Sequence, residues 1–179
     1  MKQSGTTLLE LLVVLAVLSI LLTLAVPNFA AFVRNSRLSS ATNELISSLH
    51  LARSEAIKRR SRVVSCPSAT GSSCAADGGW HQGWLVFHDA NNNASVDAGE
   101  TVILARQAFP AGLRLTGNTP VSKYISYTPS GATKMISGAF QAGKLTVCNE
   151  SGSSGTARQV VISGTGRPRT TTVGIASCP

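Results

Sequence analysis

The sequence predicts an α+β protein in which a long amino-terminal helix, first transmembrane and then amphipathic, packs on a carboxyl-terminal antiparallel β-sheet domain. Three observations support this prediction. Residues 6–26 are almost entirely apolar, residues 38–56 repeat small and apolar side chains at helical spacing, and short apolar runs separated by Gly and Ser turns follow. We expect a leader at 1–5, a transmembrane half-helix at 6–26, an amphipathic half-helix at 27–62 and a β-rich domain at 63–179.

The apolar run from Thr6 to Val26 is long enough to cross most of a hydrocarbon core as a helix. Glu10 lies inside it, and a carboxylate there costs about 2.5 to 3.5 kcal/mol on insertion scales, so Glu10 should have a partner or a task. A secretory signal peptide cut near Ala25 or Ala30 is the alternative. The acid within the run and the helical pattern beyond both positions argue against it.

The helical pattern continues past Pro27, where we expect a kink. One face then repeats at steps of three and four residues: Leu38, Ala41, Leu45, Ser48, Leu49, Ala52 and Ala56. This half of the helix should pack its stripe against a sheet. The cations of residues 58–62 suit the carboxyl end of the helix.

The rest of the chain predicts eight strands. We expect them at residues 62–66, 83–88, 101–107, 113–116, 124–128, 144–148, 158–163 and 170–175. They should pair antiparallel, because no long crossover helices remain to join parallel strands.

The four cysteines are Cys66, Cys74, Cys148 and Cys178. An even number in a chain that we expect to be exported indicates two disulfides, for which three pairings are possible. We favour Cys66 with Cys74 and Cys148 with Cys178. Zinc is the competing interpretation, but no pair has the close spacing of a metal knuckle.

The amino-terminal residues resemble the processing site of type IV pilins and type II secretion pseudopilins. Gly5 precedes a hydrophobic run in which Glu10 is the fifth residue. The resemblance implies that a prepilin peptidase cuts between Gly5 and Thr6 and methylates the amine of Thr6, and that Glu10 sets the register of subunits in a filament. Thr6 departs from the family, which usually has an aromatic or other hydrophobic residue there.

Residues 80–100 narrow the resemblance to the GspH/FimT group of minor pilins and pseudopilins. A strand with Gly83 and Trp84 precedes an Asp/Asn turn that ends in Asp97, Gly99 and Glu100. The resemblance implies assembly with other pilin or pseudopilin subunits. It also implies single-pass anchoring in the inner membrane with a periplasmic carboxyl-terminal domain, followed by entry into an extracellular or periplasmic filament.

The same turn has the spacing of a calcium loop. Positions one, three, five, seven, nine and twelve are Asp89, Asn91, Asn93, Ser95, Asp97 and Glu100. Ala94 stands where such a loop wants glycine, and the flanking elements look like strands. The alternative is a hairpin turn whose Asx side chains bond their own backbone. We favour the hairpin, with no metal, and keep calcium as the weaker alternative.

A second candidate site lies near the carboxyl end. Gly166, Arg167 and Arg169 surround Pro168, and residues 151–179 contain no acidic residue. Pro168 favours an extended Arg167, so both arginines should lie on one side, about 6 to 7 Å apart, where they can clamp neighbouring phosphates. Arg158, Lys144 and the basic cluster of residues 58–62 are candidate supports. DNA-binding FimT-type minor pilins display a similar Gly-Arg-x-Arg motif; a solvated basic turn is the alternative.

The resemblance, together with the acid-free arginine segment, implies a minor pilin of a type IV filament that binds extracellular DNA for uptake in natural transformation. The alternative is an H-type pseudopilin with a purely structural role at the tip of a type II secretion pseudopilus. The net charge of +8 suits an anionic partner, but does not choose between single- and double-stranded DNA. We expect neither catalysis nor a cofactor, since His50, His81 and His88 lie in no catalytic pattern.

Overall fold

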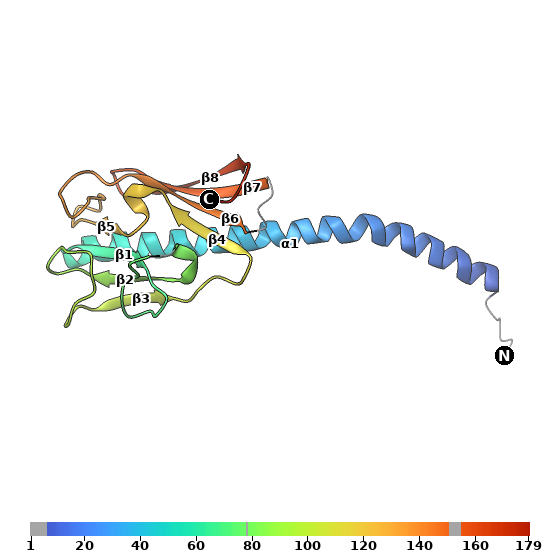
Figure 1. The fold of residues 1–179 in the computed structure, drawn as a ribbon, viewed down its shortest axis with the longest axis horizontal. Helices are drawn as coiled ribbons and strands as arrows, with labels where there is room; N and C mark the ends of the chain where they lie inside the picture. Colours follow the sequence, from blue (N-terminus) through green and yellow to red (C-terminus); the bar gives the residue numbers. More distant parts are fainter. Residues whose placement is uncertain (1–6, 78, 151–154) are drawn as a thin grey trace. The chain divides into compact units, whose positions relative to one another are not determined.

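The computed structural model of the protein describes residues 7–77, 79–150 and 155–179. The chain forms two compact units, of which the first ends at Arg37 and the second runs from Leu38 to Pro179. The helix α1, Leu8–Arg59, contributes to both units. The α+β prediction is confirmed, because eight strands follow α1 in the described residues and all their pairings are antiparallel (Figure 1).

The first unit is the amino-terminal part of α1. Its large apolar side chains between Leu8 and Phe32 are all exposed, and an 18-residue window has a mean hydropathy of 2.8. By length and composition this helix can cross a membrane. The hydroxyl groups of Ser19 and Thr23 donate to the carbonyl oxygens of Ala16 and Ile20, so the helix satisfies these polar groups internally.

In the second unit, one stripe of α1 is buried. Its members are Leu38, Ala41, Thr42, Leu45, Ser48, Leu49, Ala52 and Ala56. The predicted stripe is therefore confirmed, with Thr42 in addition. The Thr42 hydroxyl donates to the Leu38 carbonyl oxygen at 2.6 Å, which removes the cost of burying it.

The helix ends in a Schellman motif centred on Arg60, which has a φ of 50°. The N–H of Ser61 donates to the Ala56 carbonyl oxygen and the N–H of Arg60 donates to that of Ile57, both at 3.3 Å. This sharp stop turns the chain directly into the first strand.

The first sheet has the strand order β3-β2-β1-β5. Its strands are β1 (Val63–Pro67), β2 (Trp84–His88), β3 (Val102–Arg106) and β5 (Ile125–Tyr127). The second sheet has the order β4-β6-β7-β8 and consists of β4 (Leu113–Gly117), β6 (Gly143–Asn149), β7 (Gly155–Ile162) and β8 (Pro168–Ile175). All eight predicted strands are present. The sequence did not predict their division into two sheets, which arises because β4 pairs with β6 and not with β3.

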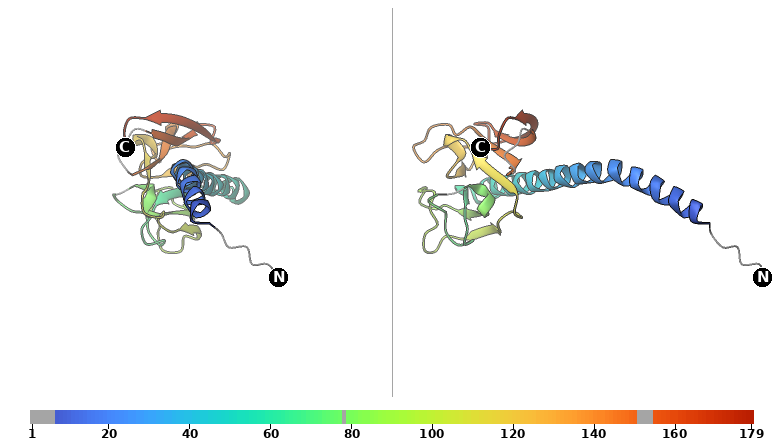
Figure 2. Two further views of the ribbon diagram at one scale, coloured as in Figure 1. Left: turned by 90° about the vertical axis from the view of Figure 1, so that its right-hand side faces the viewer. Right: turned by 45° about the vertical axis from the view of Figure 1, so that its right-hand side comes forward.

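The buried stripe of α1 and the inner faces of both sheets form one hydrophobic core. Its largest side chains from the strands include Trp84 and Tyr127 of the first sheet and Leu115 and Leu145 of the second. Figure 2 shows the second sheet on one side of this part of α1 and the first sheet on the other. A smaller cluster on the outer face of the first sheet is covered by Val96 and other residues of the connecting loops.

Two disulfides link the pairs that we favoured from the sequence. Cys66 bonds Cys74, eight residues away, and Cys148 bonds Cys178, thirty residues away. The second bond joins β6 to the segment after β8. Because β7 lies between these strands, the carboxyl-terminal segment crosses the second sheet to reach Cys148.

Candidate functional site

Thr7 caps the start of α1. Its hydroxyl accepts a hydrogen bond from the N–H of Glu10 at 3.3 Å, and its carbonyl oxygen accepts one from Leu11 at 3.2 Å. Thr7 and Glu10 thus have the spacing of a capping box. The expected processing site, Gly5 and Thr6, lies outside the described residues.

The loop between β2 and β3 uses its acidic side chains to bind its own backbone. Asp89, which is fully buried, accepts hydrogen bonds from the N–H groups of Asn93 at 3.0 Å and Ala94 at 3.1 Å. Glu100 accepts from the N–H groups of Ala90 at 2.8 Å and Asp97 at 3.1 Å. These bonds close the loop as the hairpin interpretation expects.

Burial and hydrogen bonding shift the pKa values of two aspartates in this loop in opposite directions. Burial raises the pKa of the Asp89 carboxyl above its ordinary value. The side-chain amides of Asn91 and Asn93 both donate to Asp97 at 2.7 Å and lower the pKa of that carboxyl. The amide groups therefore face Asp97 with their nitrogens, whereas a calcium ion needs oxygens.

The turn between β7 and β8 is fixed by glycine. Gly166 has a φ of 76°, and its N–H donates to the Ser163 carbonyl oxygen at 2.8 Å. A Cβ at this position would collide with the carbonyl oxygen of Gly131. Only glycine therefore fits both the left-handed backbone and the close approach to Gly131.

Gly131 belongs to residues 128–141, which we call the tip segment. This segment folds back on itself through the bridge of Lys134 with Phe140, and its Thr133 forms a bridge with Tyr127 of β5. It also bonds the β7–β8 turn, because the N–H of Thr133 donates to the Gly164 carbonyl oxygen at 3.2 Å. The tip segment and the β7–β8 turn thus form one surface.

Arg167 and Arg169 are both exposed, and neither has an ion pair among the described residues. Arg169 pairs with Val161 of β7, and Val161 pairs with Lys144 of β6. Residues opposite each other in antiparallel strands project to the same face. Arg169 and the exposed Lys144 therefore lie on the outer face of the second sheet, two strand spacings or about 10 Å apart.

Arg158 does not belong to this group. It pairs with Val147 of β6, a residue of the hydrophobic core, so its side chain starts from the inner face of the second sheet. Arg169 occupies the outer face. This register does not favour Arg158 as a support for Arg167 and Arg169. It does favour Lys144, which lies on the same face as Arg169.

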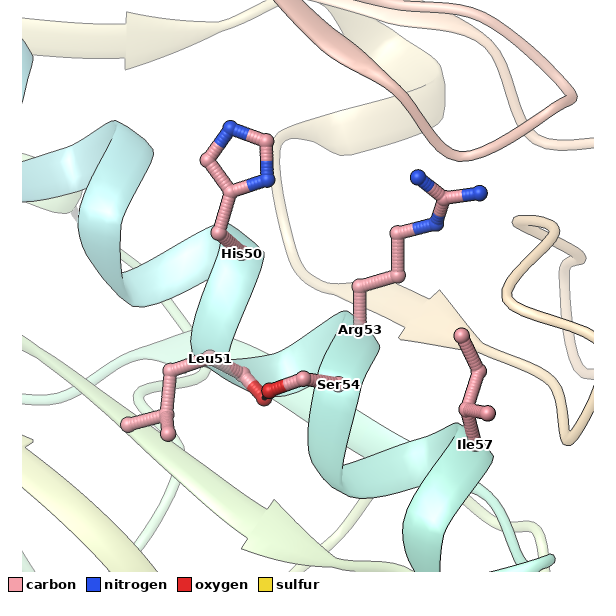
Figure 3. A pocket seen from close by; sticks show the side chains of 5 residues that line it. All are labelled: His50, Leu51, Arg53, Ser54 and Ile57. Atoms are coloured by element: carbon pink, nitrogen blue, oxygen red, sulfur yellow. Dashed lines mark hydrogen bonds between the residues drawn. The ribbon is translucent and has the colours of Figure 1, made fainter.

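Two arginines bond the tip segment: Arg53 of α1, and Arg62, which lies three residues after the end of the helix. Arg53 donates from Nε to the Gly131 carbonyl oxygen at 2.9 Å, and Arg62 donates to the Met135 carbonyl oxygen at 3.5 Å. Figure 3 shows His50, Arg53 and Ile57 on one side of the helix, where they line an open groove. The cations at the helix end and the β7–β8 turn are therefore anchored on the same tip segment.

The three histidines have different surroundings. His88 bonds the Ser61 hydroxyl at 2.8 Å, His81 approaches the Leu115 carbonyl oxygen at 3.5 Å, and His50 lies on the helix groove. Within the described ranges, no three His, Cys, Asp or Glu side chains are grouped so that they could hold a metal ion.

The helix, the two sheets and the amino-terminal pattern define a type IV pilin-like subunit. A model of the family described as type II transport protein GspH matches residues 41–166, and one of the prokaryotic N-terminal methylation motif matches residues 1–26. The chain belongs to the GspH family. Proteins of this family are pilins and pseudopilins, which are structural subunits and are not known as enzymes.

Individual relatives agree with this assignment. The pilin-like protein PilA1 of Thermus thermophilus is 37% identical over 100 residues, which are 56% of this chain and 57% of that protein. Two crystal structures of the type IV minor pilin FimU of Pseudomonas aeruginosa have TM-scores of 0.62 and 0.52 at 20% identity. They cover 83% and 79% of this chain and 99% of the FimU chains, and they share the fold.

Proposed function

We propose that the protein is a minor subunit of a type IV filament that binds extracellular DNA for uptake. A peptidase cuts after Gly5, residues 6–26 hold the subunit in the inner membrane, and residues 27–62 and 63–179 form its periplasmic part. Methylated Thr6 and Glu10 then set the register against neighbouring subunits. The match to the methylation motif and the exposed apolar surface of the first unit support this assembly route.

The proposal for DNA rests on one observation: the exposed Arg167 and Arg169, which have no ion pair among the described residues, follow a turn whose shape is held by uncharged contacts. The contact of Gly166 with Gly131 fixes the backbone of the turn without using either guanidinium group. Guanidinium groups bind phosphate in a bidentate way and need little reordering when their backbone is already rigid.

The distribution of charge also favours an anionic partner at this end. After residue 100, the only acidic residue in the sequence is Glu150. Glu150 directly follows the carboxyl end of β6. The other end of this strand, Gly143, pairs with Ile162 beside the β7–β8 turn. Seven residues of strand separate Glu150 from the turn, which corresponds to about 20 Å. Glu150 is therefore far from DNA phosphates bound at the turn. The acidic side chains of the β2–β3 loop, which lies at the same end of the domain, accept hydrogen bonds from their own loop.

DNA binding by the full chain in nonionic detergent micelles, measured across a salt series, tests this function. Wild-type protein should bind, and its affinity should fall with salt. The Arg167→Ala/Arg169→Ala variant should lose most binding. Its plot of log affinity against log salt concentration should be less steep by about 1 to 2 in slope. The matched control is Arg114→Ala/Lys123→Ala, which removes two exposed charges outside the turn. Equal losses in both variants, or no binding by the wild type, would overturn the proposal.

The second candidate function is that of a structural H-type pseudopilin, and the description of the family model favours it. It requires assembly but no DNA contact. Deletion of the gene should then block export of secreted proteins, while the Arg167→Ala/Arg169→Ala variant should restore export completely.

A further inference from the structure

Phe140 is the most exposed large apolar side chain of the second unit among its described residues, at 77%. An aromatic side chain gains stability by burying its large apolar area, so an exposed ring offers a surface on which a partner can stack. The neighbouring Ile136, at 53%, is also exposed.

The structure holds this ring beside the candidate DNA site. Phe140 pairs with Lys134 in the bridge that closes the tip segment. A Cβ on Gly164 would lie 3.3 Å from the Phe140 ring, so the ring packs against the β7–β8 turn, three residues before Arg167. One edge of the exposed ring therefore lies beside the same turn that presents the arginines.

The surroundings of the ring are cationic. Lys134 Nζ lies 5.9 Å from the ring centroid, and Arg62 reaches the same segment through the Met135 carbonyl oxygen. Arg167 follows on the adjoining turn. An apolar protein surface would leave these charges without a partner. A nucleotide offers both a π-face for the ring and a phosphate for the cations.

We propose that Phe140 is a stacking platform for an unpaired nucleobase, and that Phe140, Lys134, Arg167 and Arg169 together bind single-stranded DNA in preference to duplex. This rests on the DNA binding proposed above. Bases inside a duplex have both faces covered by their neighbours, so the ring reaches a base only where the strand is unpaired.

The test uses the full chain in nonionic detergent with three fluorescent probes of equal length: an oligothymidylate of about 20 nucleotides, an abasic strand with the same backbone, and a duplex. Wild-type protein should bind the oligothymidylate most tightly. Phe140→Ala should weaken that binding about tenfold and leave binding of the abasic strand unchanged. Phe140→Trp should keep the affinity, and the fluorescence of its exposed indole should be quenched by oligothymidylate and not by the abasic strand.

The outcomes separate this inference from the function on which it rests. If Phe140→Ala binds all probes like wild type while Arg167→Ala/Arg169→Ala loses them, DNA binding stands and the stacking role is wrong. If wild-type protein binds none of the probes, both proposals fall. If Phe140→Ala binds DNA normally but no longer enters filaments, the ring contacts a neighbouring subunit and stacking is again excluded.

Discussion

The β2–β3 loop and the β7–β8 turn both lie at the end of the β-domain where α1 stops, but their charged side chains differ in bonding. In the β2–β3 loop, Asp89, Asp97 and Glu100 all accept hydrogen bonds from their own loop. In the β7–β8 turn, the backbone is held by glycine and neutral contacts, and Arg167 and Arg169 have no ion pair in the described part of the chain. Charges that shape a loop are already engaged, so the unengaged pair is the better candidate for binding.

The largest effect should come from Gly166→Ala, which attacks the neutral support of the turn. Strain at the positive φ and the collision with Gly131 should cost the β-domain about 2 to 4 kcal/mol. Thermal denaturation followed by near-ultraviolet circular dichroism of Trp80 and Trp84 measures this. Gly174→Ala is the control, since a Cβ there meets nothing within 4 Å. Equal stability of the two variants would show that the turn does not need its glycine.

Asp89→Ala should have the next largest effect, because it removes the acceptor on which the β2–β3 loop closes. The N–H groups of Asn93 and Ala94 lose their partner, with an expected cost of about 1.5 to 3 kcal/mol. The same denaturation measurement applies. Asp97→Ala is the matched control, and its exposed position predicts a smaller loss.

The pH dependence of stability sharpens this result, because the two aspartates act in opposite directions. Asp89 has a raised pKa when folded, so its contribution to stability falls as the pH rises from 3.8 through the native value. Asp97 has a lowered pKa, so its contribution is present above 3.8 and is lost as the pH falls through the native value. Asp89→Asn and Asp97→Asn should therefore change the pH profile of the melting temperature with opposite signs.

The smallest effect should be a gain from Ala94→Gly. Ala94 has a φ of 58°, a conformation that glycine adopts without the strain of a Cβ. We expect about 0.5 to 1 kcal/mol of added stability. Arg60→Gly, at a φ of 50°, is the matched change outside the loop. A loss at Ala94 would mean that its methyl group in the cluster over the first sheet contributes more than the strain costs.

Local patterns were sufficient to predict most of the fold. The stripe from Leu38 to Ala56 follows the helical period, and the eight strands are short apolar runs between turn residues. The cap at Thr7 was also readable, since Thr7 and Glu10 have capping-box spacing, but it was not predicted.

The remaining features depend on contacts between distant residues. Only the pairing of Arg158 with Val147 reveals that this arginine starts from the inner face of its sheet. The role of Gly166 depends on Gly131, and no local signal in the sequence connects these two glycines. Phe140 could have been noticed as an aromatic residue in a Gly- and Ser-rich segment, but its place beside Gly164 could not.

The bond between Cys148 and Cys178 has a mechanical consequence. β8 is an edge strand whose strand neighbour is β7, through eight residue pairs. A load applied at Arg167 or Arg169 pulls on the first residues of β8 and stresses these pairs in shear. The covalent bond to β6 keeps the far end of the strand from peeling away. The disulfide therefore gives this edge strand a covalent attachment to its sheet that can resist tension.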